Sequence, residues 1–403
     1  MAVDRAQGGS KRAGAEQALA WVDLQTKALA SEAVPIAEAG GRILAEEVRP
    51  TMDLPPIDRA AVDGVALRAD DTVGASTYNP IVFRWVAVAA ADLAPGTAAR
   101  VNAGEPLPRG ADAVIRSEHV GSDGRGAGTV TEPVVAGSGT ERKGSQGARG
   151  SVLITAGRRL RSSDIGLLAA AGLVRISVVR RPRVRCLLAS RTIEPPEGKI
   201  YDANSPLLRA LIERDGGIVA EQRTIQGDRA LLRHALLLPG ADIVLVAGGT
   251  GPGGDDHAAA ALAEAGEVAI HGLALRHAET TGMGMAAGVP VLLLPGTPMA
   301  CLLAYEFLAG PAIRRLGGQN PSFPFLPREM TASRKIVSEI GMTELRPVRC
   351  PNKLLAEPIA GFAEAGLKSV AVADGFVLIP EGSEGYSQGA TVTVYLYDGY
   401  ERA

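Results

Sequence analysis

The sequence has few of the features that mark specialised protein classes. It has only three cysteines, Cys186, Cys301 and Cys350, which are odd in number and far apart in the 403 residues. This excludes a disulfide framework and a CxxC metal or redox site, and it predicts a reducing, cytoplasmic location. The N-terminus is charged and contains glycine, so we expect no signal peptide. No stretch has 18 consecutive apolar residues, so we expect no membrane span.

An excess of charge of one sign is also missing. Lys and Arg number 42 and Asp and Glu number 44, which gives a net charge of -2. The sequence therefore lacks the basic footprint of proteins that bind nucleic acid or anionic membranes. The five histidines show no HxxxH or HExxH spacing, so no histidine metal cage is expected. We expect a small-molecule or protein partner.

Periodicity and turn residues predict four domains. Residues 16–47 carry two helical patterns, ALAWVDLQTKALA and IAEAGGRILAEEV, and a further one lies near 162–172. They suggest a discontinuous helical and linker domain at 15–50 and 145–177. A β-rich domain at 51–144 is inserted into it. Strands and helices then alternate over 178–320, which predicts a parallel, doubly wound α/β sheet with helices on both faces. Short strand patterns over 321–403 predict an all-β C-terminal domain.

The α/β domain contains an unusually glycine-dense loop after the buried strand DIVLVA. The loop comprises Gly248, Gly249, Thr250, Gly251, Pro252, Gly253 and Gly254, and a helix is expected near Asp255. Glycine permits close approach, so the backbone N–H groups of such a loop can face an anion, and we predict a phosphate or oxyanion site. The alternative is a tight structural turn with Asp255 or Asp256 as the helix N-cap.

The usual nucleotide motifs match this loop poorly. No GK[ST] follows, which excludes a Walker A site. Gly249, Gly251 and Gly254 satisfy GxGxxG, so a dinucleotide-dependent oxidoreductase is a weaker alternative. The loop follows the third strand of its unit, however, whereas that motif belongs to the first.

A second turn, Pro295, Gly296, Thr297 and Pro298, ends the next predicted strand. Because the carboxyl ends of parallel strands share one edge of the sheet, we expect both turns to face one pocket. A structural role is the alternative, since proline is also common at the first position of a helix. Asp63, in AAVDGVA, is either a turn residue or a carboxylate presented to a ligand.

Several separated blocks occur in a distinctive order: VPIAEAGGRILAEEV, PPIDRAAVDGVALRADD, AGEPLPRGADAVIRSEH, SVLITAGRRLRSSDIGLLAAAGLVRISVVRRPRV, GKIYDANSPLLRALI and ADGFVLIPEGSEGYSQG. Together they resemble the MoeA-type molybdopterin molybdenumtransferases, which include the gephyrin E domain. The resemblance implies an elongated, four-domain homodimer with a MoaB/Mog-like molybdopterin-binding α/β domain and a C-terminal β-barrel-like domain. It also implies a role in molybdenum cofactor biosynthesis, in which adenylated molybdopterin is bound and hydrolysed and molybdate is inserted with release of AMP, usually with Mg2+.

The resemblance also assigns candidate site residues. Asp63 and Asp256 match family acids and are the candidate catalytic residues and Mg2+ ligands. The candidate cofactor-binding residues are Gly248, Gly249, Thr250, Gly251, Gly253, Gly254, Arg276, Pro295, Gly296, Thr297 and Pro298.

Other family positions are replaced, namely by Ala103, Gln146, Arg191, Thr192, Gly227, Glu279 and Thr297. Most of these replacements remove acidic or lysine residues. They support an alternative in which the chain is a divergent paralogue that binds molybdopterin or the finished cofactor and delivers it to a partner enzyme.

Overall fold

The computed structural model describes residues 12–87, 92–190, 202–226, 228–253, 256–361 and 366–398. The chain divides into two compact units. The first comprises Met1–Glu32 and Val179–Ala403, and the second comprises Ala33–Val178. Within the described ranges, every helix is too short or too polar to span a bilayer.

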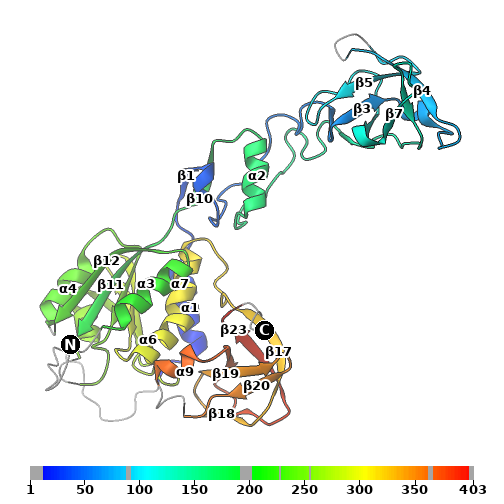
Figure 1. Cartoon of the computed structure of the whole chain (residues 1–403). Coiled ribbons are helices and arrows are strands. Elements are labelled where there is room, and N and C mark those ends of the chain that lie inside the picture. Colours follow the sequence, from blue (N-terminus) through cyan, green and yellow to red (C-terminus); the bar gives the residue numbers. More distant parts are fainter. Residues whose placement is uncertain are drawn as a thin grey trace. The chain divides into compact units, whose positions relative to one another are not determined.

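A six-stranded sheet that includes β11 and β12 forms the centre of the first unit (Figure 1). Its strand order is β12-β11-β13-β16-β15-β14. Its strands are β11 (Arg183–Ser190), β12 (Ile218–Gln226), β13 (Ile243–Ala247), β14 (Gly266–His271), β15 (Gly282–Ala286) and β16 (Val289–Leu294). The first four strands in this order are parallel. This confirms the predicted doubly wound α/β fold.

Helices cover both faces because the buried strands are apolar on both sides. Ile243 and Leu245 of β13 belong to one core cluster, and Val244 and Val246 belong to another. The first cluster packs against α1 (Ala15–Gln25), α3 (Asn204–Arg214), α6 (Pro298–Ala304), the π-helix η4 (Tyr305–Ala309) and α7 (Gly310–Leu316). The second packs against α4 (Arg229–Leu237) and α5 (Ala258–Ala265). Helix α1 thus joins the α/β core, although the sequence groups it with the discontinuous domain.

The β14–β15 hairpin is a feature that the strand pattern did not predict. Strand β15 runs antiparallel to both β16 and β14. Its sequence, GMGMA, is rich in glycine, and glycine is depleted in strands. At Gly284 an added Cβ would lie 1.9 Å from the carbonyl oxygen of Glu267, so glycine permits the close pairing of the hairpin.

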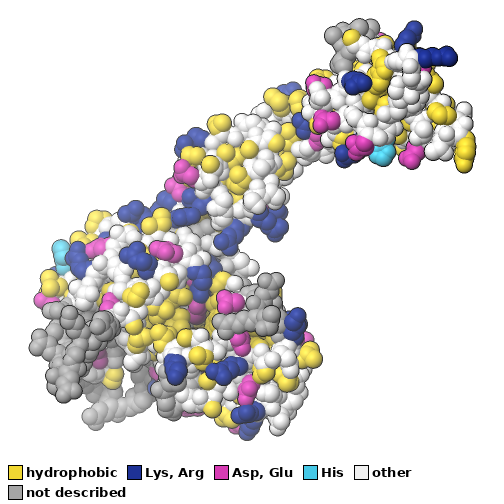
Figure 2. Space-filling model, viewed as in Figure 1, with side chains coloured by type: hydrophobic (Ala, Val, Ile, Leu, Met, Phe, Trp, Pro, Cys, Tyr) yellow, Lys and Arg dark blue, Asp and Glu magenta, His cyan; other side chains and the backbone are white. Residues whose placement is uncertain are grey.

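A closed barrel with strand order β17-β20-β19-β21-β23 follows, which confirms the predicted barrel-like C-terminal domain. The elements of this region are β17 (Leu326–Ala332), β18 (Ile336–Val337), β19 (Glu344–Asn352), β20 (Leu355–Pro358), α9 (Leu367–Ala371), β21 (Gly375–Ile379), β22 (Gly385–Tyr386) and β23 (Thr391–Leu396). An aromatic group that includes Phe323, Phe376 and Tyr395 packs against the α/β core cluster. On the face of this unit shown in Figure 2, basic and acidic side chains are interspersed.

The second unit is mainly β-structure. A six-stranded sheet has the order β6-β3-β5-β4-β8-β7, and two small sheets pair β1 with β10 and β2 with β9. The elements are β1 (Ser31–Pro35), η1 (Ile36–Glu38), β2 (Arg59–Ala60), β3 (Gly64–Leu67), η2 (Ala69–Thr72), β4 (Ile81–Trp85), β5 (Thr97–Val101), β6 (Ala113–Arg116), η3 (Ser117–His119), β7 (Val120–Ser122), β8 (Gly128–Val130), β9 (Thr140–Glu141), α2 (Ser162–Ala170) and β10 (Arg175–Val179). The four domain boundaries derived from the sequence stay a prediction.

The predicted second helix, in IAEAGGRILAEEV, is wrong. Only the 3-10 turn η1 forms, and the chain reverses at Gly41, which has a φ of 74°. Backbone bridges then join Ile43 to Arg159 and Val48 to Ile154. Pairing with a distant segment therefore overrides the local helical pattern.

Candidate functional site

The glycine-rich loop begins directly after β13. Gly248 and Gly249 have φ values of 93° and 63°, which favour glycine. An added Cβ on Gly248 would lie 2.4 Å from the carbonyl oxygen of Ala189, at the end of the neighbouring strand. The glycine content thus allows this turn to pass close to β11.

The second turn lies against the first, as the strand order predicts. The Gly248 N–H donates to the carbonyl of Leu294 over 2.9 Å. An added Cβ on Gly296 would lie 3.2 Å from the Cα of Gly248. Gly296 and Thr297 are exposed, and α6 begins at Pro298 without a side-chain cap from Thr297. The two turns therefore form one continuous edge.

This edge carries backbone donors that the fold does not use. Within the described part of the chain, the N–H groups of Gly249, Thr250 and Gly251 find no hydrogen-bond partner, and those of Gly296 and Thr297 find none either. Buried backbone N–H groups in folded proteins are nearly always paired, whereas those at a loop surface remain available to water or to a ligand. Thr250 is buried, and the other four residues are half-buried or exposed. Such a nest of amides is suited to bind an anion.

Asp256 closes the loop. Its carboxylate accepts the N–H of Gly253 over 3.1 Å, and an added Cβ on Gly251 would lie 2.6 Å from the same carboxylate. Helix α5 starts at Ala258 with His257 at its N-cap position, so Asp256 does not act as the helix cap. Gly254 and Asp255 lie outside the described residues.

Thr250 lies at the centre of the loop and is only 3% exposed. Its hydroxyl pairs with the hydroxyl of Thr280 at 2.9 Å, and its carbonyl oxygen lies 3.0 Å from Nε2 of His271. The Thr250 side chain is thus used within the fold.

Arg276 is oriented toward the C-terminal domain. Its guanidinium contacts Glu339 at 2.6 Å and Glu344 at 3.6 Å, and its backbone N–H donates to Thr343. The positive charge that the sequence placed among the ligand-binding groups is therefore balanced by two acids. The nearby Glu279 accepts the backbone N–H of His277.

Asp63 belongs to the second compact unit. One of its oxygens accepts the N–H of Ala103 over 2.7 Å, in a hydrogen bond that is exposed to solvent. The following residue, Gly64, begins β3 and passes so close to β6 that a Cβ would lie 2.0 Å from the Ile115 carbonyl. This packing fixes the backbone that presents the Asp63 carboxylate.

The described residues contain no ready-made metal site. Among the described residues, no three His, Cys, Asp or Glu side chains gather where they could hold an ion. The candidate Mg2+ ligand Asp256 is bonded to its own loop, and the other candidate, Asp63, is bonded to Ala103. These residues do not fit a preassembled Mg2+ cage.

Three side chains that are not among the candidates from the sequence lie near the loops. Asn204, at the start of α3, donates its Nδ2 hydrogen to the Gly296 carbonyl over 2.8 Å, and its Oδ1 is buried without a partner in the described part of the chain. His271 and Thr280 hold Thr250. Two signals were available for Asn204: it stands in the block GKIYDANSPLLRALI, and it follows β11, whose carboxyl end lies at the same edge.

Comparisons with known proteins match this architecture along the chain. The family model described as MoeA N-terminal region (domain I and II) matches residues 14–172, the probable molybdopterin binding domain matches 179–315, and the MoeA C-terminal region (domain IV) matches 329–397.

Full-length relatives show the same agreement. Molybdopterin molybdenumtransferase 2 of Mycobacterium tuberculosis is 29% identical, with 90% of this chain and 94% of the relative covered. The molybdopterin molybdenumtransferase of Bacillus subtilis is 28% identical, with 91% and 90% covered. A crystal structure of the molybdopterin biosynthesis MoeA protein of Pyrococcus horikoshii superposes with a TM-score of 0.75 at 32% identity and covers 97% of this chain and all of that one. The order of its domains, its fold and this similarity over its whole length show that the chain belongs to the MoeA family of molybdopterin biosynthesis proteins.

Proposed function

We propose that the chain acts in molybdenum cofactor biosynthesis at the insertion step. It would bind adenylated molybdopterin, hydrolyse the adenylate bond and transfer molybdate to the dithiolene with release of AMP. The observation that carries this proposal is the run of unpaired N–H groups on the two adjoining turns, within the ranges that the structure describes. The names of the relatives, molybdopterin molybdenumtransferases, support the transferase reaction over simple delivery of the cofactor.

In this mechanism the glycine-rich loop binds a phosphate oxygen through the N–H groups of Gly249, Thr250 and Gly251. Prearranged amide donors stabilise negative charge that develops on the phosphate as the bond breaks, and they need no reorganisation during the reaction. Pro295, Gly296, Thr297 and Pro298 form the adjoining wall. Arg276 would act through its ion pairs with the C-terminal domain, which keep the segment after β14 in place.

The two candidate acids have different proposed roles. Asp256 keeps the loop closed through Gly253, so its first role is to hold the amides in position. Asp63 has one oxygen fixed by Ala103 at a solvent-exposed position, and it is the candidate carboxylate for activating water.

We propose that Mg2+ enters bound to the substrate phosphates, because the described residues provide no cage for it. Mg2+ commonly keeps several waters and uses one or two carboxylates together with phosphate oxygens. Calorimetry should detect no tight Mg2+ binding to the protein alone. A tight site in the absence of nucleotide would contradict this part of the proposal.

We further propose that the protein is a cytoplasmic homodimer, as the family resemblance implies. Light scattering after gel filtration tests the oligomeric state, and a monomer at micromolar concentration would contradict it.

The decisive experiment is single-turnover release of AMP from adenylated molybdopterin in the presence of molybdate and Mg2+. The wild-type protein should release AMP, and Asp63→Asn should slow the release by about a hundredfold or more, as expected for loss of a general base. Asp123→Asn is a matched control, because Asp123 is an exposed acid that serves only a local turn in the same unit. Failure of the wild-type protein to release AMP would overturn the proposal.

A further inference from the structure

The loop that carries the unpaired amides has few means of holding its own shape. Gly248, Gly249, Gly251 and Gly253 have no side chains that could fix it, and glycine has wide conformational freedom. The Gly249 carbonyl accepts the N–H of Ala258, and Asp256 accepts the N–H of Gly253. Between these two points, Thr250 is held at its carbonyl by His271 and at its hydroxyl by Thr280. Both of these residues come from the region of the β14–β15 hairpin.

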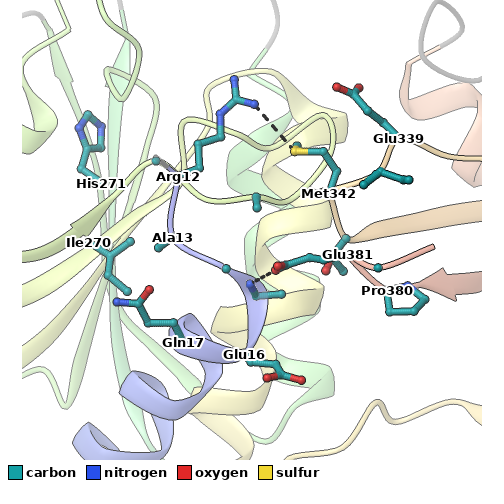
Figure 3. A pocket seen from close by; sticks show the side chains of 18 of the residues that line it. Arg12, Ala13, Glu16, Gln17, Ile270, His271, Glu339, Met342, Pro380 and Glu381 are labelled. Carbon is teal, nitrogen blue, oxygen red and sulfur yellow. Dashed lines mark hydrogen bonds between the residues drawn. The ribbon is translucent and has the colours of Figure 1, made fainter. Parts of the chain in front are cut away.

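The contact with His271 has a defined chemistry. A carbonyl oxygen only accepts hydrogen bonds, so Nε2 of His271 must carry the hydrogen that it donates to Thr250. His271 is the last residue of β14 and is exposed. It also lines a cavity of about 1310 Å³, whose wall includes Arg12, Met342 and Glu381 (Figure 3).

Holding the Thr250 carbonyl also sets the direction of the next amide. The carbonyl of Thr250 and the N–H of Gly251 belong to one planar trans peptide, in which they point in opposite directions. A hydrogen bond from His271 to the oxygen therefore directs the Gly251 N–H away from the imidazole. Gly251 is one of the donors left unpaired in the described part of the chain, so His271 controls the orientation of a group proposed to bind phosphate.

We propose that His271 is a positioning residue for the anion site, acting through the Thr250–Gly251 peptide and not by touching the substrate. This inference rests on the proposed function. Thr280 also contacts Thr250, but it bonds to the side-chain hydroxyl. The orientation of the Thr250–Gly251 peptide plane therefore depends on His271.

The test compares His271→Leu, which removes the donor, with His271→Gln, which keeps an N–H donor on a side chain of similar reach. His234→Leu is the matched control, because His234 is an exposed histidine on α4. His271→Leu should lower kcat for AMP release by about tenfold to a hundredfold, the range for a misplaced catalytic group, with a smaller change in KM. His271→Gln should restore most of the loss, and His234→Leu should behave as wild type.

A second readout does not need turnover. Hydrogen exchange of the Gly248 and Gly253 amides, which are bonded to Leu294 and Asp256, should be faster in His271→Leu than in wild type and close to wild type in His271→Gln, while the melting temperatures stay similar. Wild-type kcat and exchange in His271→Leu would overturn the proposal, as would a folded His271→Gln as impaired as His271→Leu. If wild type releases no AMP, the proposed function fails, and the exchange rates still decide whether His271 orients the loop.

Discussion

Gly248→Ala is the substitution that most directly tests the site. Gly248 has a φ of 93°, so alanine would be strained by about 1–2 kcal/mol. Its Cβ would also lie 2.4 Å from the carbonyl oxygen of Ala189. That oxygen belongs to the backbone at the end of β11, so the clash is relieved only if the turn moves. Forced overpacking of this kind typically destabilises by about 1–3 kcal/mol more.

Gly240→Ala separates the backbone strain from the steric clash of the added Cβ. Gly240 has a φ of 95°, and an added Cβ there meets nothing within 4 Å. It lies in the turn before β13, whereas Gly248 lies in the turn after it. Gly240→Ala should therefore lose only the backbone term of about 1–2 kcal/mol and should leave the loop in place.

The assay combines urea unfolding with calorimetric titration of AMP. Gly248→Ala should be destabilised by about 2–5 kcal/mol in total and should bind AMP at least about tenfold more weakly, because the amides after it are displaced. Gly240→Ala should bind AMP as wild type does. The reasoning is refuted if both variants lose the same stability and Gly248→Ala keeps wild-type affinity for AMP.

Three further predictions concern other parts of the first unit. Asp256→Ala should weaken AMP binding because the Gly253 N–H loses its acceptor, whereas Asp256→Asn should retain most of the affinity. If calorimetry shows equal losses of affinity in the two variants, the negative charge of Asp256 is responsible instead. Asp215→Ala should destabilise the fold by about 3–5 kcal/mol in urea unfolding, because Asp215 pairs with two arginines and its loss leaves buried positive charge; a near-neutral effect would contradict this. Burial raises the pKa of the Cys186 and Cys301 thiols to about 12, so mass spectrometry should find neither alkylated by iodoacetamide in the native protein at mildly alkaline pH, and rapid labelling would show that the core opens.

Local pattern explains which parts of the fold could be predicted. The strand Ile243–Ala247 is uniformly apolar, and the glycine run comes directly after it, so strand, turn and helix order can be predicted from neighbouring residues alone. The same logic failed for IAEAGGRILAEEV, where the helical spacing is correct but Gly41 reverses the chain and distant segments pair with Ile43 and Val48. Local pattern also did not predict β15, because its sequence, GMGMA, is rich in glycine and glycine is depleted in strands.

The sequence by itself determined the order of the elements, the α/β class and the concentration of glycine at the carboxyl end of β13. Only the tertiary structure decided what surrounds that loop: Gly296 against Gly248, Asn204 on the Gly296 carbonyl, and His271 on Thr250. It also turned Arg276 toward acids of the C-terminal domain. The physical reason is the separation along the chain over which each effect acts. Helical and turn preferences act over a few residues, whereas these contacts join segments that become neighbours only after the sheet has formed with its strand order.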